Sequence, residues 1–153
     1  KIINSFSYIE HYSIFKRYPS SLEIKIYEAD ILANFKDGKK NFYIGSNGRF
    51  IEANNPKDGV PSIFGKFNIN NFLKLKKKID NSNLNYTDIY NVYFFDSNRW
   101  DIETKEGILI RLPIENISKA LNFSVKLLNK KKFSNIKIID LRIENQVILN
   151  ERR

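Results

Sequence analysis

The fold is decided first by residues 41–53, which read Asn-Phe-Tyr-Ile-Gly-Ser-Asn-Gly-Arg-Phe-Ile-Glu-Ala. Two extended runs, 41–45 and 50–53, lie on either side of Asn47 and Gly48. An Asn-Gly pair between such runs is a strong hairpin signal, because a type I′ turn needs a positive φ at both of its central residues. These residues therefore predict a β-hairpin with a type I′ turn.

Alternating apolar and polar residues extend this β-rich pattern toward the N-terminus. Residues 12–15 and 22–27 have the period of two expected of half-buried strands. Between them lies the turn 18–21, whose proline cannot occupy the middle of a strand because it has no N–H donor. We predict a hairpin here, a further extended segment at 29–36, and the tail of a helix at 1–8.

Toward the C-terminus, two stretches have helical spacing instead. A helix that begins after Asn68 would be capped by the asparagine side chain. Its apolar stripe would be formed by Ile69, Phe72, Leu73 and Ile79. Residues 115–131 repeat apolar side chains with the same spacing and end in lysines, which suit the C-terminal end of a helix dipole. Both stretches are predicted to be α-helices.

The remaining segments are typical of strands. Residues 90–95 predict a buried strand, while 100–104 and 108–112 alternate as a second hairpin. The last two segments, 136–143 and 146–149, are separated by a very short link and predict a terminal hairpin or bend. Because hairpins are mixed with two helices and no regular βαβ alternation, we predict an α+β fold with a mainly antiparallel sheet flanked by two helices.

The composition is that of a folded globular protein and excludes several classes. With 153 residues, 42% of them hydrophobic, the chain is one domain, or one domain with a fragment of another. No run approaches the roughly 18 consecutive apolar residues that a membrane helix needs. With no cysteine and only His11, disulfides, a thiolate nucleophile and most metalloenzymes are excluded. We expect no catalytic residue, no metal site and no cofactor.

The formal net charge of +9 favours an anionic partner such as nucleic acid, anionic lipid or an acidic polymer. A compositional explanation competes with this interpretation, because 23 Ile, 20 Asn and 19 Lys against 7 Arg and 4 Ala are typical of adenine- and thymine-rich codons. The lysine clusters at 74–78 and 130–132 also lie on the outer sides or ends of predicted helices, where solvated charges are usual. Binding of nucleic acid or another anionic polymer is therefore kept as an alternative function.

Asp101 and Glu103 are the candidates for acid and base catalysis on a glycan. They lie two residues apart on one predicted strand, so both carboxylates would share a face, as such a pair requires. We favour a different interpretation, a cross-strand ion pair between Asp101 and Arg111 on the wet face of the sheet. Trp100, which opens the strand, is expected to anchor the core.

Two stretches near the N-terminus carry a resemblance to a known family. Residues 8–10, Tyr-Ile-Glu, are followed by residues 15–28, which read Phe-Lys-Arg-Tyr-Pro-Ser-Ser-Leu-Glu-Ile-Lys-Ile-Tyr-Glu. A basic-aromatic-Pro turn, a Leu-x-Ile-x-Ile strand and a Glu in this order resemble the close of the POTRA domain in the bacterial cell-division family FtsQ/DivIB.

Four further motifs resemble the family in the same order. Residues 44–48 occupy the place of its Asp-x-x-Gly hairpin, and 60–65, Val-Pro-Ser-Ile-Phe-Gly, are similar to its Leu-Pro-x-Leu-x-Gly loop. Residues 99–102, Arg-Trp-Asp-Ile, resemble its Trp-x-Leu strand. Residues 138–143, Ile-Ile-Asp-Leu-Arg-Ile, resemble its Val-Asp-Leu-Arg strand, the most specific of these motifs. The chain departs from the family where Ile143 replaces an aromatic residue.

The resemblance implies a single-pass protein of the bacterial inner membrane, with this region in the periplasm. Residues 1–28 would be the C-terminal part of a POTRA domain, and residues 29–153 would be the β domain of the FtsQ type. The cytoplasmic tail, the membrane helix and the first half of the POTRA domain are then expected to lie outside the given sequence.

The resemblance also implies a non-enzymatic scaffold of the divisome. Its partners would be FtsB and FtsL, and through them FtsW and FtsI, which make septal peptidoglycan; a nucleic-acid partner is not expected. A final strand has one edge of unpaired N–H and C=O groups, which is a template for strand addition. We expect FtsB to bind there, with Arg142 as the anchor for a partner carboxylate. The alternative is a structural role, in which Arg142 pairs with Asp140 or Asp101 and the side chains of Val147 and Leu149 face the core. The expected contact residues are Arg142, Ile143, Gln146, Val147 and Leu149.

Overall fold

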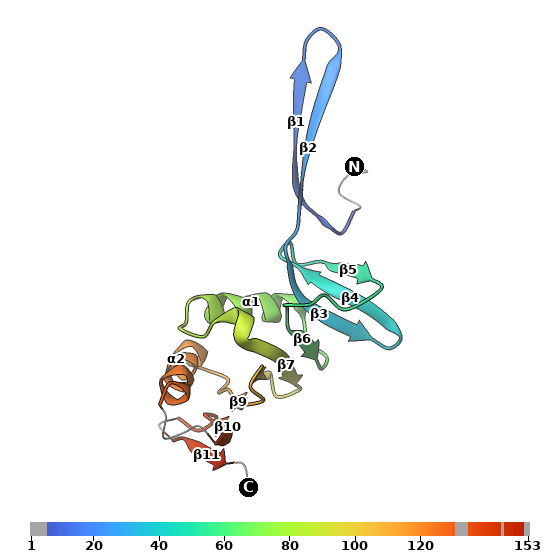
Figure 1. Ribbon diagram of the computed structural model, residues 1–153. Coiled ribbons are helices and arrows are strands. Elements are labelled where there is room, and N and C mark those ends of the chain that lie inside the picture. Colours follow the sequence, from blue (N-terminus) through green and yellow to red (C-terminus); the bar gives the residue numbers. More distant parts are fainter. Residues whose placement is uncertain (1–5, 131–134, 145, 152–153) are drawn as a thin grey trace. The chain divides into compact units, whose positions relative to one another are not determined.

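The computed structural model describes residues 6–130, 135–144 and 146–151 (Figure 1). The predicted α+β class is confirmed, since a mostly antiparallel set of strands, paired largely as hairpins, is combined with two α-helices. The chain divides into two compact units, Lys1–Lys57 and Asp58–Arg153, which are described separately. The helical tail predicted at 1–8 lies mostly outside the described residues, and residues 7 and 8 form a turn.

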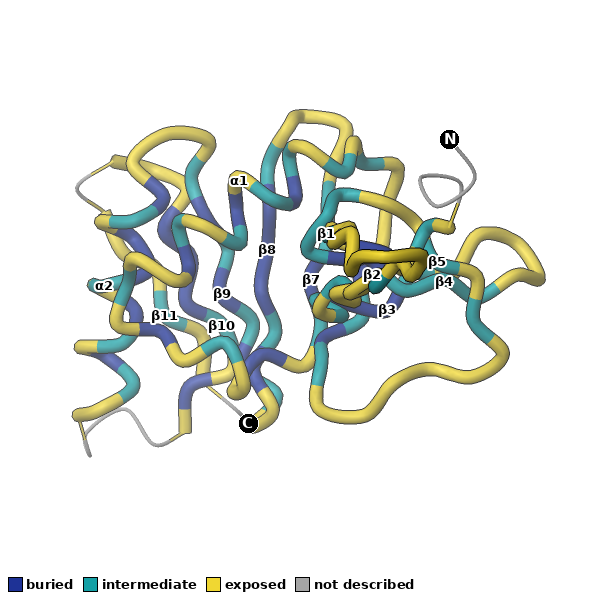
Figure 2. The backbone as a smooth tube through the Cα atoms, turned by 90° about the horizontal axis from the view of Figure 1, so that it is seen from above, coloured by how far each residue is buried: buried dark blue, intermediate teal, exposed yellow. Residues whose placement is uncertain are grey.

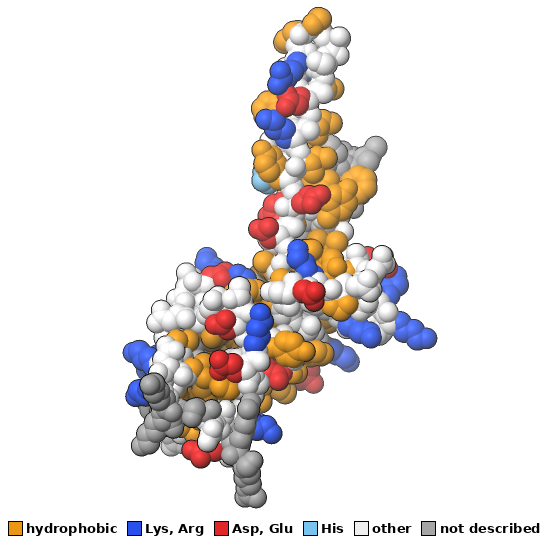
Figure 3. Space-filling view, in the orientation of Figure 1, with side chains coloured by type: hydrophobic (Ala, Val, Ile, Leu, Met, Phe, Trp, Pro, Cys, Tyr) orange, Lys and Arg blue, Asp and Glu red, His pale blue; other side chains and the backbone are white. Residues whose placement is uncertain are grey.

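In the first unit, β1 (Ile9–Arg17) and β2 (Ser21–Glu28) form the predicted antiparallel hairpin. One face carries apolar side chains from both strands, namely Tyr12, Ile14, Leu22, Ile24 and Ile26. The prediction of half-buried strands is wrong, because almost all of these positions are exposed (Figure 2). Hydrophobic side chains are accordingly visible along the hairpin in Figure 3.

A second antiparallel group in this unit contains β3 (Ile31–Asp37), β4 (Lys40–Gly45) and β5 (Phe50–Ala53). The predicted β4–β5 hairpin is confirmed, but its turn is not type I′. Gly48 has a φ of +71°, whereas Asn47 is not among the described non-glycine residues with positive φ. The Asn47 side chain is instead fixed by hydrogen bonds: its Oδ1 accepts from the Arg49 N–H at 3.1 Å, and its Nδ2 donates to the Ser7 carbonyl at 2.9 Å.

The second unit contains a sheet in which the strands lie in the order β11-β10-β9-β8-β7-β6. Its strands are β6 (Ser62–Phe64), β7 (Ile89–Phe95), β8 (Arg99–Thr104), β9 (Leu109–Arg111), β10 (Ile136–Asp140) and β11 (Ile148–Glu151). The pairs β6–β7 and β9–β10 are parallel, and the other three are antiparallel. The predicted hairpins β8–β9 and β10–β11 are both present.

Two helices, α1 (Ile69–Asp80) and α2 (Ile117–Leu128), occupy the predicted stretches, and a short 3₁₀ helix, η2 (Tyr86–Asp88), precedes β7. Asn68 caps α1 as predicted, because its Oδ1 accepts a hydrogen bond from the Asn70 N–H at 2.8 Å. The buried stripe of α1 includes Leu75, which the predicted stripe omitted. At the start of α2, Asn116 has a φ of +55° and makes no capping hydrogen bond.

The core of the second unit forms between the helices and one face of the sheet. Trp100 of β8 is 4% exposed. The centroid of its ring lies 4.6 Å from the ring centroid of Phe94, 5.9 Å from that of Phe67 and 6.4 Å from that of Phe72 on α1. Figure 2 shows β8 largely in the buried colour. The prediction that residues 90–95 are buried is wrong at Tyr90 and Phe95, which are 59% and 40% exposed.

Replacing Trp100 tests this core. Trp100→Ala should lower the free energy of unfolding by about 3–5 kcal/mol, because it leaves a cavity between α1 and the sheet. Tyr90→Ala, on the neighbouring strand, is the matched control and should cost less than about 1 kcal/mol, because its ring is solvated. Urea unfolding followed by circular dichroism measures both. Equal losses for the two variants would contradict Trp100 as the centre of the core.

Candidate functional site

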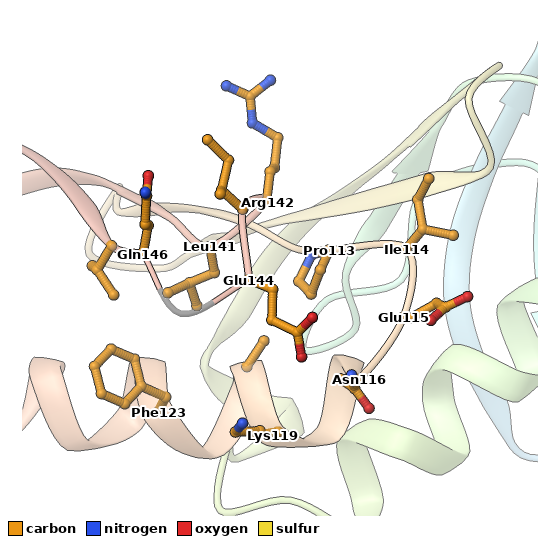
Figure 4. A pocket seen from close by; sticks show the side chains of 13 residues that line it. Pro113, Ile114, Glu115, Asn116, Lys119, Phe123, Leu141, Arg142, Glu144 and Gln146 are labelled. Atoms are coloured by element: carbon orange, nitrogen blue, oxygen red, sulfur yellow. The ribbon is translucent and has the colours of Figure 1, made fainter.

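An open groove lies in the second unit between α2 and the chain that follows β10 (Figure 4). Its volume is about 470 Å³, enough for several side chains of a bound segment. The lining residues are Pro113, Ile114, Glu115, Asn116, Lys119, Ala120, Phe123, Leu141, Arg142, Ile143, Glu144, Gln146 and Val147. They come from the β9–α2 link, the first turns of α2 and the segment between β10 and β11.

Large apolar side chains in the groove are exposed. Ile114, Phe123, Ile143 and Val147 are between 37% and 56% exposed, although all are large hydrophobic residues. In Figure 4, Phe123 points from α2 toward the segment that carries Gln146. Charged side chains on both sides complete the lining. Apolar walls with a charged rim are typical of a surface that binds another polypeptide.

Four of the five predicted contact residues line this groove, and the fifth does not. Arg142, Ile143, Gln146 and Val147 are lining residues, whereas Leu149 lies on β11 opposite Ile139. The predicted final strand at 146–149 is shifted, since β11 runs from Ile148 to Glu151. Gln146 belongs to a turn instead, because its N–H donates to the Ile143 carbonyl at 3.2 Å.

A row of alternating charges crosses the ends of three strands beside Arg142. On β8, Arg99 Nε donates to Asp101 Oδ1 at 3.2 Å. On β9, Arg111 Nη1 lies 3.5 Å from Asp140 Oδ2. Asp140 also binds Arg142 through several contacts, the shortest of which joins Arg142 Nη2 to Oδ2 at 2.6 Å. We call Arg99, Asp101, Arg111, Asp140 and Arg142 the charge row.

The two carboxylates of the charge row are perturbed in opposite directions. Hydrogen bonds from Arg142 hold the pKa of Asp140 below its ordinary value of 3.8. Burial raises the pKa of Asp101 above that value, although Arg99 and Arg111 favour its charged form. Asp140 is thus stabilised as an anion by its partner, and Asp101 is penalised as an anion by the loss of water.

The favoured interpretation of Asp101 is partly wrong. Asp101 and Arg111 are direct cross-strand neighbours, but the ion pair of Asp101 is with Arg99, and Asp101 is 2% exposed rather than on a wet face. Glu103 accepts hydrogen bonds from the Tyr93 hydroxyl at 2.6 Å and from Asn91 Nδ2 at 2.9 Å. One oxygen of each carboxylate, Oδ1 of Asp101 and Oε2 of Glu103, therefore has a structural partner.

The structure describes only part of the two predicted lysine clusters. Lys76 is not simply solvated, because its Nζ contacts Asp80 Oδ1 at 2.6 Å and lies 4.3 Å from the centre of the Tyr86 ring. Lys131 and Lys132 lie outside the described residues.

Within the described part of the chain, no three His, Cys, Asp or Glu side chains are grouped so that they could hold a metal ion.

Sequence reasoning missed the wall of the groove that α2 and its preceding link supply. Phe123 is the clearest signal that could have found it, because this aromatic residue lies outside the buried stripe of its helix. Ile114 is a second signal, since it is an apolar residue in a loop. Neither signal specifies that the chain after β10 forms the other wall of the groove, opposite α2.

Asp140 should contribute stability that is lost in acid. A carboxyl whose pKa is lowered by folding stabilises the folded chain above its unfolded pKa, and this contribution disappears as the pH falls through the folded pKa. Asp140→Asn should therefore lower the free energy of unfolding by about 1 kcal/mol at neutral pH. The difference from the unaltered chain should shrink as the pH falls below 3.8. Urea unfolding at a series of pH values measures it.

Asp101 is the control, because the pH dependence of its contribution to stability should have the opposite sign. Because its pKa is raised by folding, protonation favours the folded chain, so its contribution to stability should increase as the pH falls from neutral toward 3.8. Comparing the unaltered chain with Asp101→Asn over the same series shows this trend. The same pH trend for both variants would contradict the assignment.

Comparison with known proteins identifies the family. Residues 33–142 match the family described as Cell division protein FtsQ/DivIB, C-terminal. The chain is similar to Cell division protein FtsQ of Rickettsia bellii (strain RML369-C), with 29% identity over 153 residues that cover 94% of this chain and 55% of that protein. It therefore spans about half the length of this relative. Neither helix of the described residues has the length and apolar character required to cross a membrane.

A solved structure is also similar, that of the major extracytoplasmic domain of the trans isomer of the bacterial cell division protein DivIB from Geobacillus stearothermophilus. The TM-score is 0.47 at 13% sequence identity, and the match covers 62% of this chain and 87% of that chain. The family match alone spans most of the present sequence. The chain belongs to the FtsQ/DivIB family of cell-division proteins.

Proposed function

We propose that this chain is part of a non-enzymatic divisome scaffold that binds FtsB and FtsL and links them, through FtsW and FtsI, to septal peptidoglycan synthesis. The observation that carries the proposal is the groove, because four of the five residues predicted to contact a partner line it, together with exposed apolar side chains. Membership in a cell-division family supports the cellular role. The remainder of the longer protein is proposed to supply a single membrane helix that leaves this region in the periplasm.

The proposed domain division assigns residues 1–28 to a partial POTRA domain and 29–153 to the β domain. The hairpin of β1 and β2 supports a partial domain, because a two-stranded ribbon is rarely stable alone in water. Its apolar face is exposed, with Ile14 at 53% and Leu22 at 64%. On the opposite face, Arg17 and Glu23 form an ion pair at 2.6 Å. A ribbon with exposed apolar side chains of this kind fits one layer of a larger domain.

Strand addition is proposed at β11. This strand is the last in the sheet order, so no described strand pairs with its outer edge. Such an edge presents N–H and C=O groups that a partner strand can satisfy. Val147 and Gln146 lie just before β11 and line the groove. A partner that pairs with β11 could therefore continue into the groove with its side chains.

Arg142 is proposed as the anchor for a partner carboxylate. The charge row contains three arginines and two aspartates, so it has one positive charge more than its own carboxylates neutralise. The side chain of Arg142 is 41% exposed and lies at the end of the row. An acidic residue of the partner would complete the alternation of charges.

Charge reversal tests this anchor. Arg142→Glu should weaken binding of a peptide from the periplasmic part of FtsB by about tenfold or more, because it replaces an attraction by a repulsion next to Asp140. Lys137→Glu is the matched control, since Lys137 is an exposed cation on β10 and lies outside the groove lining; it should change affinity by less than about threefold. Isothermal titration calorimetry measures both variants.

The same titrations separate the scaffold from a binder of anionic polymers. Tight binding of random DNA or RNA that weakens steeply as salt rises, together with no binding of the FtsB peptide, would contradict the scaffold. Equal effects of Arg142→Glu and Lys137→Glu would contradict Arg142 as the anchor while leaving β11 as the docking edge.

Methylation of the partner backbone tests strand addition. In a β-strand, alternate residues direct their N–H groups to the same neighbour. Two FtsB peptides should therefore be compared, each N-methylated at every second residue but in complementary sets. One of the two methylated peptides should no longer bind the chain, and the other should bind with the affinity of the unmodified peptide. Equal affinities of the two sets would contradict pairing with β11.

A further inference from the structure

The guanidinium of Arg142 has two edges that can each bind a carboxylate, and the structure uses only one of them. Its Nε donates to Asp140 Oδ1 at 2.8 Å, and its Nη2 donates to Asp140 Oδ2 at 2.6 Å. Among the described residues, no hydrogen bond or ion pair involves Nη1 of Arg142. Figure 4 shows the guanidinium pointing away from α2. The edge formed by Nη1 and Nη2 is therefore open to solvent.

Asp140 is held more firmly than the arginine that it binds. It is 8% exposed at the end of β10, where its backbone is paired with Ile148 of β11 and Arg111 of β9. Its Oδ1 accepts a hydrogen bond from the Arg142 N–H at 3.1 Å, and its Oδ2 lies 3.5 Å from Arg111 Nη1. The carboxylate is thus fixed by the sheet and can orient the more exposed Arg142.

We propose that Asp140 is a positioning residue, which holds Arg142 by its Nε–Nη2 edge so that the Nη1–Nη2 edge receives a carboxylate of the partner; this rests on the proposed function. Planar guanidinium groups bind carboxylates in this paired manner, and an orientation fixed in advance reduces the entropy lost on binding. Specificity then depends on the fork of an arginine and not on positive charge alone.

A double-mutant cycle tests the role of Asp140 with the FtsB peptide. Arg142→Ala and Asp140→Asn should each weaken binding by about tenfold or more, as expected for a lost hydrogen bond to a charged group. If Asp140 acts through Arg142, adding Asp140→Asn to the Arg142→Ala variant should have no further effect. All titrations are made at neutral pH. Circular dichroism of each variant at the same pH shows whether it is folded.

Arg142→Lys is the second measurement, because it leaves a positive charge beside Asp140. A lysine keeps the charge but cannot bind two carboxylates through two edges, so it should weaken binding almost as much as Arg142→Ala. Wild-type affinity of the Arg142→Lys variant would overturn the inference, because charge alone would then suffice.

The remaining outcomes separate the inference from the proposed function. If Arg142→Ala weakens binding and Asp140→Asn does not, only the role of Asp140 is overturned. An equal effect of Asp140→Asn in the presence and absence of Arg142 would make Asp140 merely structural, and would overturn the inference while leaving the anchor. Unchanged binding by Arg142→Ala overturns the anchor and the inference together, and no binding by the unaltered chain overturns the proposed function with them.

Discussion

The alternation of side chains along β8 is the constraint on which the second unit depends. Trp100 and Ile102 face the helices and are buried, while Asp101 lies on the opposite face with Arg99 and Arg111. A shift of one residue would exchange these faces and place a carboxylate among the aromatic rings. The packing of the core and the position of the charge row are therefore set by the same register.

Asp140 connects this register to the groove. Its carboxylate accepts the N–H of Arg142, a local contact of the kind that ends a strand. The next residue, Leu141, still donates to the Arg111 carbonyl at 2.9 Å, after which the chain leaves the sheet and turns past α2. One aspartate thus ends β10, orients the arginine and starts the segment that forms one wall of the groove.

The fold was predictable from the sequence wherever local chemistry specifies it. Asn68 caps its helix as expected, and the alternation around Trp100 places β8 correctly. The groove was not predictable, because it depends on where α2 packs relative to the chain after β10. Val147 is an example of a residue whose structure the local sequence does not specify. Its β-branched side chain favours a strand. The preceding turn, in which the Gln146 N–H donates to the Ile143 carbonyl, makes β11 begin only at Ile148.

The distribution of arginine also bears on what this surface recognises. The chain has only 7 arginines against 19 lysines, yet three of the seven lie in the charge row. A diffuse attraction to polyanions would be served by lysine, which carries the same charge. Ion pairs with fixed carboxylates, and above all the contact of Arg142 Nε and Nη2 with Asp140, need a planar fork. The placement of a scarce residue type therefore favours recognition of a specific carboxylate over general attraction by charge.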